Sequence, residues 1–329
     1  MSLTRYIAKK LVEAILTIFI GITAAFFLFR LLPGDPTAVF LDIRLTPEAK
    51  QALIRQFGLD KPLWEQYILF LINVFQGNLG ISFAYIGTPV SKLIFGPKLF
   101  NTIVLMATSM ILGAFIASIL GLLAGWKRGS LFDRLVTSLS YLSTSAPIFW
   151  IGLLILLFLC GYLGLIPVGG TISVEAIHAD PLTKIKDYLW HMIGPLIVLI
   201  LFFLPLYLLY VRNAVVTMHG EDFIFVLKAK GLPDKHILFK HIARFALITI
   251  VTLLAVHSPL LVSGAIITET VFSWNGMGLL LYESVLKSDY PVIQGIFILT
   301  IIVVVIANLL ADIAYAFLDP RIRRGGIER

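Results

Sequence analysis

Long apolar runs separated by short polar segments make up most of this chain. The runs contain at most two charged residues each and cover residues 11–32, 99–125, 135–166, 192–211, 245–268 and 291–317. A helix that crosses a bilayer needs about 20 consecutive apolar residues, and every run reaches that length. The pattern therefore predicts an all-α integral membrane protein with six transmembrane helices.

Composition supports this class. Hydrophobic residues are 59% and charged residues 14% of the 329 residues, whereas soluble domains have about 45–50% apolar and about 25% charged residues. The first run is longer than the apolar core of a signal peptide, which is about 7–15 residues, so we expect it to remain as a first span. The single cysteine, Cys160, excludes an intrachain disulfide and a cysteine-based metal site.

The distribution of lysine and arginine predicts the orientation in the membrane. If the N-terminus is cytoplasmic, the segments on that side carry 16 of the 26 Lys and Arg residues, and the two short outer segments, 167–191 and 269–290, carry 3. Short loops rich in Lys and Arg stay in the cytoplasm. We therefore expect both termini and residues 212–244 to be cytoplasmic, and we assign the net charge of +7 to topology rather than to nucleic-acid binding.

Residues 33–98 form the one sizeable segment outside the predicted membrane. Thr46 begins one predicted helix and Gly58 ends it, because a hydroxyl at the start and a glycine at the end are typical helix boundaries. Pro62 begins a second predicted helix, which ends by Gly77. It carries the aromatic residues Trp64, Tyr67 and Phe70. We expect the segment either to cap the outer mouth or to contact a solute receptor.

The longest polar interruption in the second half of the chain runs from residue 220 to residue 245. Phe223, Val226 and Leu227 fall at i, i+3 and i+4, which places them on one face of a helix. Gly231 can take the positive φ that ends many helices, and Pro233 is typical of the start of another. The pattern predicts a helix, a sharp turn and a second helix. On spacing alone, a connector resting on lipid headgroups competes equally with an element that docks on a partner protein.

This segment resembles the cytoplasmic loop of ABC-importer permeases of the dipeptide, oligopeptide and nickel family. The matching residues are Asp222, Phe223, Lys228, Ala229, Lys230, Gly231, Leu232, His241 and Arg244. Residues 225–228 differ from the family's Arg-Thr-Ala-Arg, and Leu247 and Ile248 replace its Leu-Pro pair. The resemblance implies that Asp222, Phe223, Val226, Leu227 and residues 228–232 form a coupling helix seated in a cleft of a separate ATP-binding subunit.

Further phrases resemble the same family at the right spacing. They lie at residues 147–153, 269–278, 289–295 and 319–321, with 33–36, 58–63 and 77–80 in the external segment. The candidate residues for a translocation path or gate are Pro147, Phe149, Trp150, His257, Glu269, Phe272, Trp274, Gly276 and Gly278. Because Gly276 and Gly278 permit a tight turn, this segment is either a re-entrant gate near the outer mouth or a plain ordered turn. Pro147, Pro205 and Pro259 predict kinks in three spans.

Motifs for other chemistries are absent from the sequence. It has no Gly-x-x-x-x-Gly-Lys-Ser/Thr phosphate loop, no His-Glu-x-x-His zinc pattern and no Gly-x-Ser-x-Gly nucleophile elbow. His236 and His241 are five residues apart, off the i, i+4 register of two metal ligands on one α-helical face. His257 and Glu269, the candidates for a proton relay, would lie about 18 Å apart on a straight helix. An enzyme, a metal site and an ion-gradient-driven carrier are therefore disfavoured.

The resemblance covers most of the chain and implies a permease subunit of an ABC importer with the type I fold. The expected organisation is a first helix with an external segment over 1–98, a five-helix core over 99–319 that contains the coupling loop 212–244, and a cytoplasmic tail over 320–329. The implied partners are a second related permease, two ATP-binding subunits that hold ATP and Mg²⁺, and an external solute-binding protein; this chain itself binds no cofactor.

Short peptides are the expected solute, and nickel or a metal chelate is the alternative. An ion-driven carrier and a membrane scaffold are the alternatives from other classes. The expected location is the cell membrane of a prokaryote.

Overall fold

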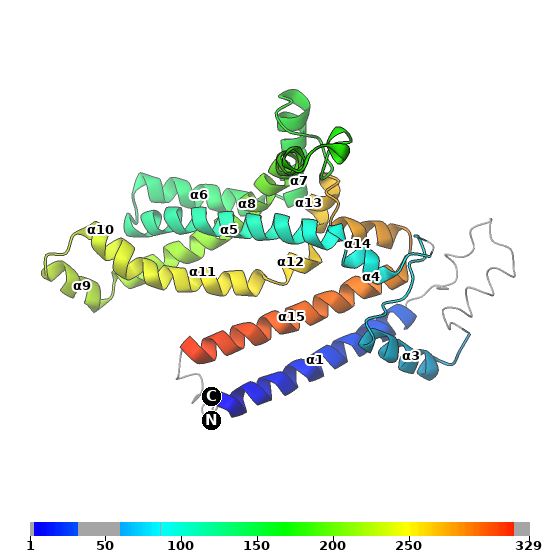
Figure 1. The fold of residues 1–329 in the computed structure, drawn as a ribbon. Helices are drawn as coiled ribbons and strands as arrows, with labels where there is room; N and C mark the ends of the chain where they lie inside the picture. Colours follow the sequence, from blue (N-terminus) through cyan, green and yellow to red (C-terminus); the bar gives the residue numbers. More distant parts are fainter. Residues whose placement is uncertain (1–2, 32–59, 86, 319–329) are drawn as a thin grey trace. The chain divides into compact units, whose positions relative to one another are not determined.

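The structure is a computed structural model that describes residues 3–31, 60–85 and 87–318 (Figure 1). These residues form helices, with one isolated bridge between Ile81 and Pro89. The predicted helix from Thr46 to Gly58 and the phrases at 33–36 and 319–321 lie outside the described residues. The chain divides into two compact units. They are Met1–Phe100 with Gly276–Arg329, and Asn101–Asn275.

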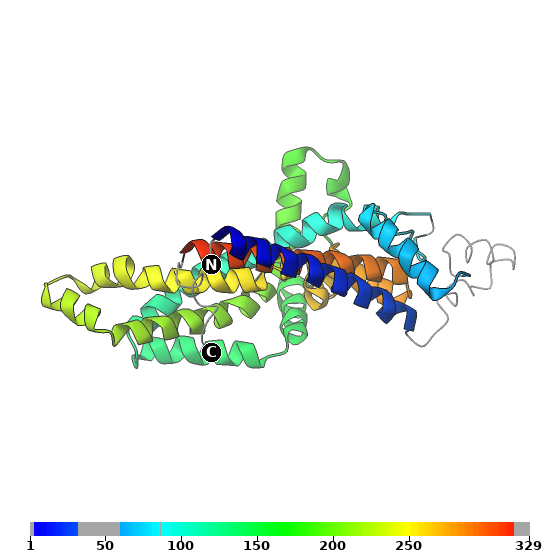
Figure 2. The same cartoon turned by 90° about the horizontal axis from the view of Figure 1, so that it is seen from below.

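In the first unit, two long helices run side by side. They are α1 (Leu3–Leu31) and α15 (Tyr290–Leu318), and Figures 1 and 2 show them adjacent in both views. A Cβ added to Gly21 of α1 would lie 2.8 Å from Ile301 Cγ2 of α15. Glycine at this position therefore allows the two backbones to approach closely.

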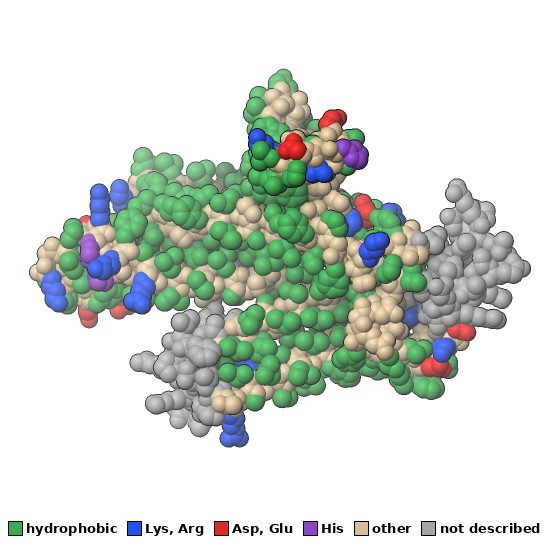
Figure 3. Space-filling view, viewed as in Figure 1, with side chains coloured by type: hydrophobic (Ala, Val, Ile, Leu, Met, Phe, Trp, Pro, Cys, Tyr) green, Lys and Arg blue, Asp and Glu red, His purple; other side chains and the backbone are tan. Residues whose placement is uncertain are grey.

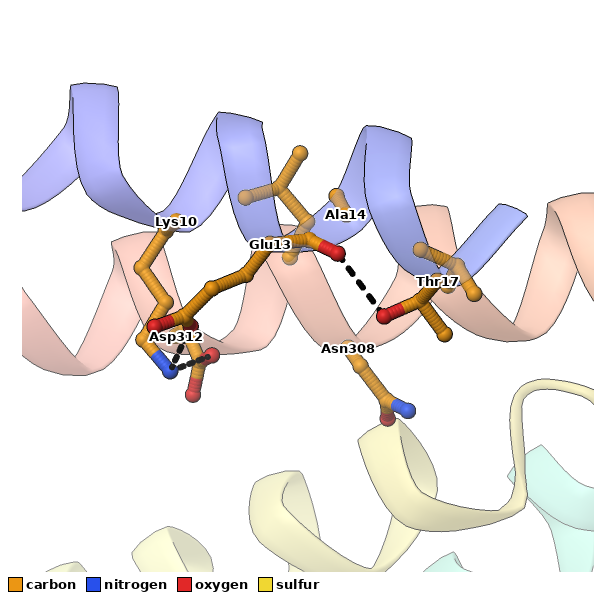
Figure 4. A pocket seen from close by; sticks show the side chains of 8 residues that line it. Lys10, Glu13, Ala14, Thr17, Asn308 and Asp312 are labelled. Carbon is orange, nitrogen blue, oxygen red and sulfur yellow. Dashed lines mark hydrogen bonds and ion pairs between the residues drawn. The ribbon is translucent and has the colours of Figure 1, made fainter. Parts of the chain in front are cut away.

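An ion cluster ties one end of this helix pair together (Figure 4). Lys10 Nζ lies 2.9 Å from Asp312 Oδ2 of α15 and 3.3 Å from Glu13 Oε2 of its own helix. Ionisable groups near hydrocarbon are costly unless they are paired. Lys9 Nζ also lies 3.8 Å from Glu13 Oε1. Two lysines therefore balance the two acids, and Lys10 links α1 to α15.

Short helices complete the first unit at its other end. α3 (Leu63–Phe75) follows Pro62 as predicted, and its Tyr67 hydroxyl lies 2.8 Å from Thr23 Oγ1 of α1. α4 (Val90–Ile94) and α14 (Met277–Leu286) pack with α15 around a small apolar core. The buried carboxylate of Asp289 accepts hydrogen bonds from the hydroxyl of Ser82 and from the backbone N–H groups of residues 83 and 84. This carboxylate fixes residues 82–84 to the start of α15.

The second unit is a bundle built around α8 (Pro181–His219), which begins at the N-cap Asp180. Its other helices are α5 (Pro97–Trp126, from Asn101 onward), α6 (Leu131–Ser145), α7 (Ile148–Ile155), η2 (Leu156–Tyr162), η3 (Glu175–His178), α9 (Asp222–Ala229), α10 (Asp234–His236), η4 (Ile237–Ile242), α11 (Ala243–His257), α12 (Leu260–Ser263) and α13 (Ile266–Val271). One apolar core joins α5, α8 and α11. Pro195 and Pro205 lie inside α8, which continues through both as a single helix.

A stripe of glycines on α5 allows α8 to pack closely against it. An added Cβ would lie 3.3 Å from Phe203 Cβ at Gly113, 2.8 Å from Val211 Cγ1 at Gly121, and 2.6 Å from Val215 Cβ at Gly125. The glycines are separated by multiples of four residues, so they lie on one face of the helix. Small residues at this spacing are the usual means by which membrane helices bring their backbones together.

The predicted spans agree with the helices in number and differ in two places. Five described helices are long and apolar enough to cross a membrane. They are Thr4–Arg30, Val90–Trp126, Pro181–His219, Asp234–His257 and Tyr290–Leu310. The count reaches the predicted six if the bent pair Leu131–Ser145 and Ile148–Tyr162 forms one span.

The two differences have a backbone cause. The run 135–166 is bent by 99° at Pro147, which precedes α7 with an extended ψ of 131°, so the predicted kink is a break. The run 245–268 was predicted as one span with a kink at Pro259, and here too the chain breaks instead of bending. Its helix ends at His257, and α12 and α13 follow, because Pro259 cannot continue a hydrogen-bond ladder and Gly264 takes φ 76°.

The two packing units are defined by contacts, and the division of the chain at residues 98 and 319 into functional segments stays a prediction. In the packing units, α15 belongs with α1 rather than with α8.

Candidate functional site

The predicted helix–turn–helix is present at residues 222–242, and we call these residues the docking lobe. α9 ends at Ala229, and Gly231 takes φ 77°. The N–H of Leu232 donates to Leu227 O at 3.3 Å and the N–H of Gly231 donates to Lys228 O at 2.9 Å. These two bonds form a Schellman motif, which satisfies carbonyls that the helix end would leave unpaired. Pro233, with ψ 145°, then begins α10 as its N-cap.

The outward face of the lobe matches the predicted stripe only in part, because Phe223 is 36% exposed but Leu227 turns inward. Ile224 is 2% exposed and Leu227 packs against the apolar core of the unit. Phe225 and Val226 are 76% and 49% exposed. The predicted stripe of Phe223, Val226 and Leu227 is therefore divided, because the i, i+3 pair Ile224 and Leu227 faces the bundle and leaves Phe225 and Val226 as the main apolar surface.

Trp126, the last residue of α5, holds the lobe to the bundle. Its ring lies 4.7 Å from the His219 ring at the end of α8, and Lys228 Nζ lies 5.2 Å from the centre of the same ring. A cation over an aromatic face is attracted by the ring's quadrupole. Lys228 therefore contributes to the position of α9 within this chain.

The surface of the lobe is positively charged. Figure 3 shows Lys, Arg and His side chains gathered over α9 and α10, whereas hydrophobic side chains cover the long helices of the same unit. The exposed basic residues of the lobe are Lys228, Lys230, Lys235 and Lys240, and its exposed acidic residues are Asp222 and Asp234. A partner that covers the lobe therefore needs an apolar centre with an acidic or neutral rim.

His236 and His241 are neighbours, contrary to the argument from α-helical register. Their ring centroids are 5.7 Å apart, because η4 between them is a π-helix whose hydrogen bonds run from i to i+5. Among the described residues no group of three or more His, Cys, Asp or Glu side chains is placed to hold a metal ion. The pair therefore brings together two possible ligands without a third.

Replacing Gly231 with valine should loosen α9. A β-branched residue at φ 77° costs about 1–3 kcal/mol of local strain, although no atom lies within 4 Å of the added Cβ. We expect the α9 amides to exchange hydrogen about one to two orders of magnitude faster. Gly231→Asn, which tolerates this conformation, and Gly220→Val, at φ −85°, are matched controls that should exchange like the native chain. Equal protection in all three variants would show that the turn is not strained.

The predicted path residues fall into separate groups. Pro147 marks the break between α6 and α7, and Phe149 and Trp150 of α7 are half-exposed. Gly276 and Gly278 belong to the other packing unit, as the N-cap and second residue of α14. Gly276 has φ −121°, and the left-handed residue of this turn is Ser273 at φ 49°. The tight turn therefore exists, but neither glycine makes it.

Glu269, Phe272 and Trp274 lie together in one buried segment. The Thr102 hydroxyl donates to Glu269 Oε1 at 2.9 Å, and Trp274 Nε1–H donates to the Asn101 carbonyl at 3.2 Å. Both partners are in α5. The segment is thus tied to α5 by side chains that periodicity does not predict.

Glycines of the second unit surround Phe272. An added Cβ at Gly194 of α8 would lie 2.6 Å from the Phe272 ring, and one at Gly169 would lie 2.7 Å from the Phe272 carbonyl oxygen. Gly170 N–H also donates to that carbonyl at 2.9 Å. The segment is therefore held by α5, α8 and residues 169–170 as a close-packed strut.

His257 and Glu269 have separate surroundings. The helix breaks between them, so the straight-helix separation does not apply. His257 Nδ1 lies 3.3 Å from the Tyr207 hydroxyl, and its ring packs against Phe203. This supports the interpretation of His257 as a histidine hydrogen-bonded within the bundle.

Sequence reasoning missed several residues that hold these elements. Ile224, Phe225 and Trp126 decide which face of α9 is presented, and Asn101 and Thr102 hold the segment that contains Glu269 and Trp274. Ile224 and Leu227 are spaced i, i+3, as are Phe223 and Val226, so two apolar stripes compete on one short helix. The polar pair Asn101 and Thr102 at the start of an otherwise apolar helix is the one signal that could have indicated buried hydrogen bonds.

Family models and individual related proteins both place this chain in the same family. Residues 117–324 match the family described as binding-protein-dependent transport system inner membrane component, and residues 3–102 match the N-terminal part of such membrane components. The oligopeptide transport system permease protein AppB of Bacillus subtilis is 34% identical over 96% of this chain and 98% of its own length. The dipeptide transport system permease protein DppB of Escherichia coli K12 is 35% identical over 97% and 98%. The di/tripeptide transport system permease protein DppB of Pseudomonas aeruginosa is 34% identical over 97% and 98%. These matches show that the chain belongs to the family of binding-protein-dependent transport system inner membrane components.

Proposed function

We propose that this chain is the permease subunit of an ATP-driven importer that carries short peptides into the cytoplasm of a bacterium. The curated relatives named above are permeases for oligopeptides, dipeptides and di/tripeptides. The observation that carries the proposal is the exposed apolar surface of Phe225 and Val226, on a lobe whose other side is built into the bundle. A chain of this family needs such a surface to receive force from a separate subunit.

The docking lobe is suited to that task. Full burial of an apolar side chain contributes about 1.5–3 kcal/mol, so Phe225 and Val226 together supply several kcal/mol before ordering costs. Ion pairs at an exposed rim contribute about 0–1 kcal/mol each. Apolar contact therefore dominates the attachment, and the lysines around it select a partner with a complementary charge.

The coupling is mechanical. α9 follows α8 after the two residues Gly220 and Glu221, and α8 is one helix over Pro181–His219. A partner that closes on ATP displaces α9, and α8 passes the displacement along its length as a rigid element. Rigid-body movement of helices switches access between the two sides. ATP and Mg²⁺ belong to the partner, and this chain performs no hydrolysis.

The proposed assembly contains a second, related permease, two ATP-binding subunits on the side of the docking lobe, and an external solute-binding protein. The family is the membrane component of a binding-protein-dependent system, which supports an external receptor. Phe149 and Trp150, which are half-exposed on α7, are the residues we propose for the translocation path, with the strut at Glu269, Phe272 and Trp274 as a fixed wall. His257 is assigned to packing within the bundle.

Reconstituting the chain with its ATP-binding and permease partners in vesicles tests the function. We expect uptake of isotope-labelled short peptides that requires ATP, requires the solute-binding protein and stops when the ATP-binding subunits are omitted. Uptake that follows an ion gradient without those subunits would favour the secondary carrier instead. Accumulation of labelled nickel without peptide would move the assignment to a metal importer.

A further inference from the structure

A buried ion pair lies at the base of the docking lobe and takes no part in its exposed surface. Asp133 is in the first turn of α6, and its residue is 3% exposed. Arg212 is on α8, ten residues before α9 begins at Asp222. The pair therefore joins α6 to the part of α8 that leads directly into α9.

Four hydrogen bonds fix the position of the Asp133 carboxylate. Arg212 Nε lies 2.6 Å from Asp133 Oδ1, and Arg212 Nη2 lies 2.8 Å from Oδ2. Gly129 N–H donates to Oδ2 at 2.9 Å, and the Thr137 hydroxyl donates to Oδ1 at 3.2 Å. A carboxylate has about four acceptor sites, and all four are used. A two-pronged guanidinium contact of this kind fixes orientation as well as distance.

α5 holds the same part of α8 on a face that adjoins the Arg212 side chain, because residues 212 and 215 are spaced i, i+3. An added Cβ at Gly125 would lie 2.8 Å from the Arg212 carbonyl oxygen and 2.6 Å from Val215 Cβ. α5 and α6 are joined by a short turn in which Gly129 takes φ 81°. The α5–turn–α6 hairpin thus holds the end of α8 at two adjoining places, by close packing at Gly125 and by the ion pair at Arg212.

We propose that Asp133 and Arg212 are positioning residues for coupling, which pass the displacement of α9 and α8 to α6. From α6 the displacement continues across the break at Pro147 into α7. This inference rests on the proposed function, because it needs a partner that moves α9. It adds the residues that convert a movement of one helix into a movement of the bundle.

Stability alone does not account for such a pair. Well-packed apolar residues at a buried ion-pair site are often as stabilising as the pair itself. We therefore assign the ion pair a role in fixing the orientation of α6 relative to α8. A two-pronged contact fixes the relative orientation of the two groups that form it. The pair therefore fixes α6 in register with α8 while α9 moves.

Arg212→Lys tests the proposal with the smallest change. Lysine keeps the charge but offers a point contact in place of the fork. The assembly with this variant should insert, bind its partners and hydrolyse ATP at close to the native rate. We expect the amount of labelled short peptide carried per ATP hydrolysed to fall by about fivefold or more, the lower end of typical coupling between sites.

The matched control is Arg134→Lys, the same chemical change at an exposed position next to Asp133. It should leave peptide carried per ATP unchanged. Asp133→Asn is a second variant, which keeps the size of the side chain and removes its charge, and it should lower the same ratio.

The outcomes separate the two proposals. If the native assembly carries peptide with ATP and both Arg212→Lys and Asp133→Asn keep the native ratio, the positioning role is wrong while the function stands. If the native assembly shows no ATP-dependent uptake, the proposed function is wrong, and the positioning role with it. A loss of uptake and of ATP hydrolysis in equal proportion, with a lowered melting temperature, would show a purely structural pair.

Discussion

Replacing Phe225 with aspartate should reduce ATP-driven uptake by about 100-fold or more while the chain still folds and inserts. Phe225 is 76% exposed and contributes nothing to the apolar core of its own chain. In the assembly the change removes about 1.5–3 kcal/mol of apolar burial and places a carboxylate in the contact, where an unpaired charge costs several kcal/mol more. The measurement is uptake of labelled short peptide together with co-purification of the ATP-binding subunit.

Two control variants make this result specific. Phe225→Leu keeps an apolar side chain and should retain most of the uptake. Ile224→Ala shortens a residue that is 2% exposed and faces the bundle, so it should lower the melting temperature before it affects partner binding. Normal uptake with Phe225→Asp would show that α9 does not dock through this face and would remove the central support of the proposed function.

The sequence predicted the helix α9 but not which of its faces packs against the bundle. The helix, its glycine stop and the proline-led restart were predicted from residues 222–234 because each depends on local backbone chemistry, and all are confirmed. Which apolar residues point inward was not predictable, since Ile224 with Leu227 and Phe223 with Val226 are equally good stripes. Packing of Ile224 and Leu227 against the apolar core of the unit, which draws on residues far away in the chain, decides between them.

The spanning helices were also predicted only in part from the sequence. Apolar runs and proline positions predicted six spans and a disruption at Pro147, and the family and the helical membrane fold are confirmed. The disruption at Pro259 was also predicted, but only as a kink in the run 245–268; apolar composition continues past Pro259 and Gly264 while the helix does not. The π-helix η4, which brings His236 and His241 together, could not be predicted from hydrophobic periodicity. It adds one residue to a turn within an otherwise α-helical pattern, and the sequence does not mark that addition.

The candidate path was predictable only in part. Glu269 and Trp274 were selected because charged and aromatic residues are conspicuous in an apolar chain, and they do lie in one segment. Their hydrogen-bond partners Asn101 and Thr102 are more than 160 residues away. Such pairing depends on how the helices pack. The same holds for Asp133 and Arg212, which are 79 residues apart.

Replacing Gly121 with leucine should destabilise the second unit by at least the upper end of the about 1–3 kcal/mol typical of overpacked sites. The Cβ alone would lie 2.8 Å from Val211 Cγ1 and 2.9 Å from the Leu208 carbonyl oxygen. Because one of these atoms is backbone, no rotamer change relieves the clash, and α5 must move away from α8. That movement also pulls the α5–turn–α6 hairpin, which contains Asp133, away from Arg212 of α8. Thermal unfolding of the purified chain in detergent measures the loss.

A graded series and a control site separate packing from polarity. Gly121→Ala already adds the clashing Cβ and should be intermediate between glycine and leucine. Gly161→Leu makes the same change at an exposed position where the nearest atom to an added Cβ is 3.6 Å away, so it should unfold at the native temperature. Because membrane helices gain little from apolar burial against each other, close packing of small residues is the main force that holds α5 to α8. Native stability in Gly121→Leu would therefore mean that the two helices are held by other contacts, and that the grip on α8 at the base of the docking lobe is looser than the glycine stripe indicates.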